Sequence, residues 1–131
     1  MENRRQKKGT AIAMTIQECY AKMGADYQEV LRRLYNEAMI QKFVLLFLKD
    51  DSYQNLETAL AAADVKTAFR AAHTLKGVCQ NLGFSNLYVP AAELTETLRA
   101  DRLDGTAEQF EQVKKQYKIT TDAIRELAGE A

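Results

Sequence analysis

The chain has 131 residues, which suits one domain, and its 47% hydrophobic and 27% charged residues are ordinary for a globular protein. Lys and Arg number 18, as do Asp and Glu, so the formal net charge is zero, which argues against a nucleic-acid binder. The longest apolar run, at 43–48, is far shorter than the roughly 18 residues that a membrane span needs. We expect one soluble domain over 13–131, preceded by a flexible basic tail over 1–12.

The predicted elements are all helical, because the chain has one proline, six glycines and no long alternation of β-branched residues. In chain order, we expect helices at 15–23, 26–34, 37–49, 51–62, 64–82, 86–101 and 106–128. Capping residues mark the predicted starts, and these are Thr15, Asp26, Asn36, Asp64, Ser85 and Thr106. Short loops between the helices predict an antiparallel up-down bundle. Pro90 is expected to kink the helix at 86–101 or to delay its start.

The predicted helix at 64–82 has two sides that differ in chemistry. At 100° per residue, an apolar stripe lies opposite His73 and is expected to face the core. The stripe comprises Ala68, Ala71, Leu75, Val78, Cys79 and Leu82. On the side of His73 lie Phe69, Lys76, Gly77 and Gln80, flanked by Lys66 and Arg70. His73, which is the only histidine, is therefore expected to point away from the core.

Gly77 favours a functional surface over an ordinary exposed histidine. Glycine in mid-helix costs about 1 kcal/mol relative to alanine, and nothing in helix packing requires it on an outward face. A surface that admits another protein's backbone or a phosphoryl group does require that room. Phe69 on the same side is useful for docking a partner, and an equally good interpretation is that a neighbouring helix covers it.

The groups around His73 suit phosphoryl chemistry. A neutral imidazole nitrogen is a good nucleophile near pH 7. Lys76, one turn away, can supply positive charge to the oxygens of a transferring phosphoryl group and disfavours the protonated imidazole. Gln80 can donate a hydrogen bond from its amide, or it is an ordinary solvated residue. Cys79 falls on the buried side, so a Cys–His pair for metal binding or catalysis is not expected.

Two short runs surround the histidine, and these are HTLKG at 73–77 and QNLG at 80–83. Together they resemble the signature of the histidine-containing phosphotransfer (HPt) domain family, in which Lys and Gly follow the histidine by three and four residues. The two alanines before His73 and the run AEL at 92–94 extend the resemblance, which spans roughly 15–127.

The resemblance implies an all-α fold, an antiparallel up-down four-helix bundle with one or two additional short N-terminal helices. It implies that His73 accepts a phosphoryl group from a receiver-domain aspartate and passes it to another receiver. In that scheme Lys76 stabilises the phosphoryl group and Gly77 gives steric clearance. Many members carry Gln or Glu in the next helix, hydrogen-bonded to the other imidazole nitrogen. Thr95 stands there, and Glu93 and Glu96 are neighbours that would substitute in a shifted register.

Further expectations follow from the residues around His73 and from the resemblance together. We expect supporting roles for Gln80 and Thr95, and partner docking by Lys66, Phe69 and Arg70. The partners implied are response-regulator receiver domains and a hybrid sensor histidine kinase, with no nucleic acid and no membrane. The protein is expected to be a monomeric, stand-alone, cytoplasmic phosphocarrier without kinase activity. No cofactor or metal of its own is expected, since any Mg²⁺ belongs to the partner receiver.

Two other hypotheses remain open at this point. The first is a non-catalytic helical adaptor that docks receiver or kinase domains without carrying phosphate, which the intact column of His73, Lys76 and Gly77 argues against. The second is a histidine-bearing fragment of a chemotaxis-like kinase, which the lack of a kinase motif in the chain disfavours.

Overall fold

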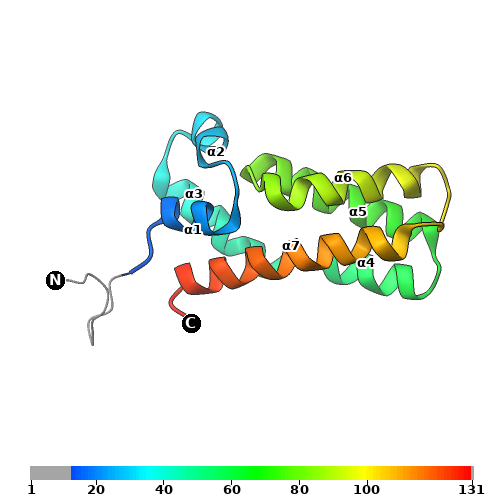
Figure 1. The fold of residues 1–131 in the computed structure, drawn as a ribbon. Helices are drawn as coiled ribbons and strands as arrows, with labels where there is room; N and C mark the ends of the chain where they lie inside the picture. The colour runs from blue at the N-terminus through cyan, green and yellow to red at the C-terminus, as the bar shows by residue number, and fades with distance from the viewer. Residues whose placement is uncertain (1–12, 131) are drawn as a thin grey trace.

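The computed structural model describes residues 13–130, and these form seven α-helices, one short 3-10 helix and no strand (Figure 1). The elements are α1 (Ile16–Met23), α2 (Tyr27–Leu34), α3 (Glu37–Leu46), η1 (Phe47–Lys49), α4 (Ser52–Ala61), α5 (Val65–Leu82), α6 (Ser85–Arg99) and α7 (Thr106–Leu127). The prediction of an all-α protein is confirmed. The tail predicted at 1–12 lies outside the described residues. No described helix is long and apolar enough to cross a bilayer.

The N-terminal part contains three short α-helices, one more than the resemblance implied. Gly24 ends α1 in the left-handed conformation, with φ of 78°, and Tyr35 ends α2 in the same way, with φ of 58°. A left-handed residue cannot continue a right-handed helix, so each one forces a new start. The expectation of one or two N-terminal helices is therefore corrected to three.

Side chains cap most of the helices where the sequence predicts. Thr15 and Glu18 form a reciprocal capping box, with N···O distances of 3.0 and 2.8 Å. Asp26, Asn36 and Asp64 each accept a hydrogen bond from the backbone N–H three residues further on. These bonds occupy amides that have no partner within the helix, so they determine where α1, α2, α3 and α5 begin.

Two predicted caps and one predicted effect of proline are wrong. Ser85 and Thr106 are the first residues inside α6 and α7, and neither caps its helix. The Thr106 hydroxyl instead donates to the Leu103 carbonyl, at 2.7 Å. Pro90 lies buried inside α6, and this helix begins at Ser85, so the proline does not delay its start. Burial of the apolar ring in the core offsets the hydrogen bond that proline cannot donate.

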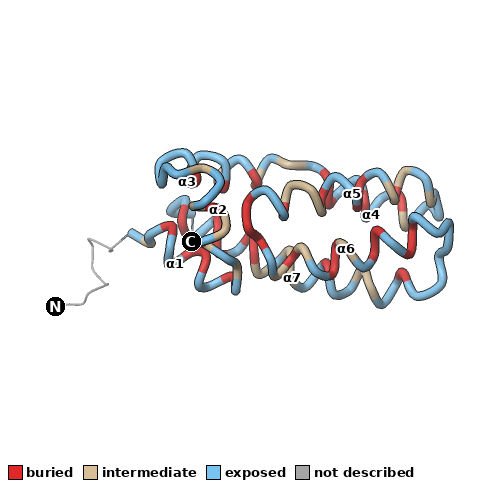
Figure 2. Tube along the Cα trace, turned by 90° about the horizontal axis from the view of Figure 1, so that it is seen from above, coloured by how far each residue is buried: buried red, intermediate tan, exposed pale blue. Residues whose placement is uncertain are grey.

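The helices α4, α5, α6 and α7 lie side by side along the long axis of the molecule, and each packs on the next (Figure 1). Buried positions recur along each of these helices and alternate with exposed ones (Figure 2). Aromatic rings join α7 to α4, because Tyr53 stacks on Tyr117, with centroids 3.9 Å apart, and on Phe110, at 5.5 Å. In this helical bundle α5 packs against α4 on one side and α6 on the other.

The N-terminal helices hold the C-terminal end of α5. The buried Tyr20 hydroxyl of α1 donates to the Leu82 carbonyl at 2.5 Å, and the backbone N–H of Asp26 donates to the Gly83 carbonyl at 2.8 Å. Gly83 has φ of 70°, and a Cβ there would lie 2.6 Å from the Asp26 carbonyl oxygen. The last carbonyls of a helix have no partner within it, so these bonds both satisfy and position the end of α5.

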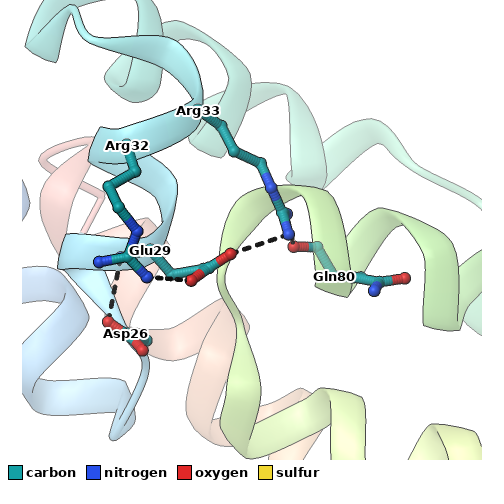
Figure 3. A network of polar contacts seen from close by, with 5 residues as sticks. All are labelled: Asp26, Glu29, Arg32, Arg33 and Gln80. Carbon is teal, nitrogen blue, oxygen red and sulfur yellow. Dashed lines mark hydrogen bonds and ion pairs between the residues drawn. The ribbon is translucent and has the colours of Figure 1, made fainter.

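A charged network on α2 reaches the same end of α5 (Figure 3). Arg33 donates to the backbone carbonyl of Gln80 and pairs with the Glu29 carboxylate at 2.9 Å. Glu29 also pairs with Arg32, and its backbone N–H donates to the Asp26 carboxylate at 3.1 Å. These groups are partly exposed, so water weakens each ion pair, and their main effect is to orient Arg33 toward α5.

We predict that Tyr20→Phe lowers the free energy of unfolding by about 1–2 kcal/mol, because the buried Leu82 carbonyl loses its donor. Burial raises the pKa of Tyr20 well above its usual value, so the hydroxyl remains a donor at neutral pH. Urea unfolding measures the change. The control is Tyr35→Phe, since Tyr35 is 84% exposed and should show no effect. Equal stability of the two variants would contradict the prediction.

Candidate functional site

The α5 helix buries one side and exposes His73 on the other. The predicted stripe is buried except for Val78, which is half-buried. Ala72 is buried as well, because α4 and α6 both pack on α5 and widen its covered side. Cys79 is fully buried and burial raises its pKa, so the structure keeps the thiol apart from the exposed imidazole. The prediction that His73 points away from the core is confirmed.

Phe69 lies beside His73, one turn earlier on α5. The two ring centroids are 5.8 Å apart and the ring planes are inclined by 72°, which is an edge-to-face arrangement. The guanidinium carbon of Arg99, on α6, lies 5.0 Å from the centroid of the Phe69 ring. Phe69 is half-buried, so it is neither a fully exposed aromatic nor a core residue.

Lys76 and Gly77 lie one turn after His73. Lys76 is half-buried and forms no ion pair or hydrogen bond with the described residues, so no structural partner within them occupies its ammonium group. A Cβ added to Gly77 would meet no atom within 4 Å. Packing therefore does not require glycine at this position, as the sequence indicates. His73 stands next to a cation and to open space.

The three predicted docking residues lie together. Lys66, Phe69 and Arg70 line one groove of about 460 Å³ between the first half of α5 and the end of α6. Arg99 lines it too, and Asp101 is its one acidic residue. The groove thus combines an aromatic wall with three cationic side chains, and it adjoins His73 through Phe69.

The two predicted supporting residues are not placed beside the imidazole by any contact. Thr95 is fully buried, and its hydroxyl donates to the Ala91 carbonyl at 2.7 Å, a local bond that uses the hydroxyl proton. The Gln80 side chain is exposed and has no hydrogen-bond partner among the described residues, whereas its backbone carbonyl accepts from Arg33 and from the Gly83 backbone N–H. Among the described residues, none hydrogen-bonds either nitrogen of His73.

Sequence reasoning missed Arg99, which the structure places over the Phe69 ring. Its Nε donates to the Glu96 carboxylate at 3.1 and 3.3 Å, so Glu96 serves an ion pair within α6. Glu93, the other neighbour considered for the imidazole, is exposed. The three-residue spacing of Glu96 and Arg99 indicates that the two side chains pair with each other on α6. The sequence of α6 alone does not indicate that Arg99 meets Phe69 on α5.

The family model of the Hpt domain matches residues 49–127, which is more than half of the chain. The chain therefore belongs to the Hpt domain family. Hpt domains are phosphocarriers, not kinases, and they transfer phosphoryl groups through a histidine in phosphorelays, where they interact with receiver domains and kinases. The match includes α4 to α7 and leaves α1, α2 and α3 outside. No curated protein and no solved structure matches the chain.

We predict that Gly77→Ala raises the free energy of unfolding by about 0.5–1 kcal/mol, because alanine is the better helix former and its methyl group enters open space. Thermal or urea unfolding measures this. The matched variant Gly83→Ala should instead destabilise the protein. The alanine would have to adopt a left-handed conformation, which costs about 1–2 kcal/mol, and its methyl group would collide with the Asp26 carbonyl oxygen. A loss of stability in Gly77→Ala would show that this glycine is structural.

Proposed function

We propose that this protein is a stand-alone phosphotransfer protein that carries a phosphoryl group on His73 between receiver domains. The observation that carries the proposal is the surroundings of the only histidine in a chain of the Hpt family. The imidazole is exposed, an unpaired lysine lies one turn away, and open space adjoins it at Gly77. Each of these features is what transfer between two proteins requires.

The proposed reaction is an in-line displacement on phosphorus. The unprotonated nitrogen of His73 attacks the aspartyl phosphate of a receiver, a nitrogen–phosphorus bond forms, and the phosphorus–oxygen bond to the aspartyl carboxylate breaks. The carboxylate leaves with the electron pair of that bond. The reverse reaction, with a second receiver's carboxylate as nucleophile, returns the imidazole to its starting state.

Each neighbour has a separate role in this reaction. Lys76 places its ammonium group against the negative oxygens of the phosphoryl group, and this stabilises the charge during transfer. Gly77 leaves room for the receiver's aspartate to approach the imidazole. The groove of Lys66, Phe69 and Arg70 docks the receiver, since its cations complement the acidic surroundings that an aspartyl phosphate provides. Gln80, with a free side-chain amide, is able to hydrogen-bond a bound partner.

The proposal extends to the setting of the protein. We place it as a cytoplasmic monomer between a hybrid sensor kinase and a response regulator, with no cofactor of its own and with Mg²⁺ on the receiver. The loops at 62–64, 83–84 and 100–105 are short, and this supports an antiparallel up-down arrangement of α4 to α7. Exposed phosphocarrier histidines need no nucleotide site, because the donor is already an acyl phosphate.

We predict that His73→Gln abolishes phosphate acceptance, because glutamine has no nucleophilic ring nitrogen, and that it leaves helicity unchanged, because His73 is exposed. Incubation with a labelled phospho-receiver followed by intact-mass measurement detects the phosphoryl group. Circular dichroism is the control for folding. Label on the His73→Gln protein would overturn the assignment, and a wild-type protein that binds the receiver but never takes label would favour the adaptor hypothesis.

We predict that Lys76→Ala slows transfer from the receiver by about 10- to 100-fold, since one charge-stabilising group contributes about 1.5–3 kcal/mol to such a step. Single-turnover transfer and the lifetime of the phosphohistidine are the measurements. Lys114→Ala, which removes an exposed lysine from α7, is the matched control. Rates and lifetimes equal to those of the control would remove Lys76 from the site.

A further inference from the structure

A row of contacts crosses from α6 to the imidazole. The Glu96 carboxylate accepts a hydrogen bond from Arg99, the Arg99 guanidinium lies over Phe69, and Phe69 meets His73 in an edge-to-face pair. Four side chains thus form a continuous row of contacts, which ends at the only histidine of the chain. Glu96, Arg99 and His73 are exposed, whereas Phe69 is half-buried and packs against the edge of the core.

The row matters because no hydrogen bond or ion pair to a described residue restrains His73. Neither of its nitrogens is hydrogen-bonded to a described residue, and Thr95, which stands where a restraining group was expected, bonds to Ala91 instead. An exposed side chain without partners samples several rotamers. In-line transfer requires the attacking nitrogen to hold one direction, so some other contact has to limit the imidazole's rotation.

Phe69 is placed to supply that restraint. A centroid separation of 5.8 Å lies within the range in which aromatic pairs attract one another, and the 72° inclination is the favoured edge-to-face geometry. The Phe69 ring is itself held, since a guanidinium at 5.0 Å from its centroid forms a cation–π contact. Glu96 in turn limits the freedom of Arg99, with Nε···O distances of 3.1 and 3.3 Å.

We propose that Phe69 and Arg99 are positioning residues for His73. Phe69 sets the orientation of the imidazole, and Arg99, reaching across from α6, holds the Phe69 ring in the place where it can do so. In this arrangement the contact with Phe69 orients the imidazole, a role that was expected for a hydrogen bond from Thr95. The expected effect of Phe69 and Arg99 on the rate of phosphoryl transfer rests on the proposed function. Their restraint of the imidazole ring does not.

The first test measures the restraint without any phosphate. The ring protons of His73 are observed by NMR in the wild type, in Phe69→Leu and in Arg99→Ala. Both variants should shift these resonances, because the Phe69 ring current is removed or averaged. The matched control is Arg102→Ala, which removes an exposed arginine that has no contact with Phe69 among the described residues. Unchanged resonances in either Phe69→Leu or Arg99→Ala would overturn the proposal.

The second test uses phosphoramidate, a small donor that releases ammonia as the phosphoryl group passes to the imidazole. This donor needs no docking surface, so it separates positioning from partner binding. Arg99→Ala should react about two- to fivefold more slowly than wild type, the factor that an exposed cation–π contact supports. Arg99→Lys should recover part of the rate, since lysine also binds an aromatic face, and Arg102→Ala should match wild type.

The outcomes separate this proposal from the proposed function. Slower transfer from a phospho-receiver together with an unchanged phosphoramidate rate would assign Phe69 and Arg99 to docking alone and would overturn a positioning role. A wild-type protein that takes no label from any donor would overturn the proposed function, and the NMR comparison would then still decide whether Phe69 and Arg99 restrain the ring.

Discussion

The site depends on how α5 is packed, because this helix buries one side and leaves the other in water. α4 and α6 cover the side of Leu75 and Leu82, and burial of that apolar surface determines how the helix is rotated about its axis. Once that rotation is set, His73 has to face outward, with Lys76 and Gly77 beside it. The exposure of the imidazole is therefore a consequence of the core and needs no separate interaction.

Contacts other than core packing fix the position of α5 along its own axis. Tyr20 and Asp26 bind the carbonyls at its C-terminal end, and Gly83 is the residue that lets Asp26 approach so closely. These contacts come from α1 and the start of α2, which lie outside the residues that match the Hpt family model. The N-terminal helices thus complete the support of the helix that carries His73, at the end opposite to the groove of Lys66 and Arg70.

Most of the helical order could be predicted, since it depends on contacts close in sequence. The caps at Asp26, Asn36 and Asp64 are bonds across three residues, so they are visible in the chain. The predictions failed where local signals compete. Thr106 has the residue type of a cap, yet Gly105 takes the cap position in the left-handed conformation and the threonine hydroxyl turns back to Leu103. Pro90 is tolerated inside α6 because its ring is buried.

The sequence by itself determined that His73, Lys76 and Gly77 share one side of a helix opposite an apolar stripe, because the 100° rotation per residue is a local property of the backbone. It also determined the family resemblance, which the match over 49–127 confirms. Only the tertiary structure decided that Thr95 is buried and bonded to Ala91, and that Arg99 covers Phe69. Those contacts depend on how α6 is rotated against α5, and helix rotation is settled by the packing of both surfaces together.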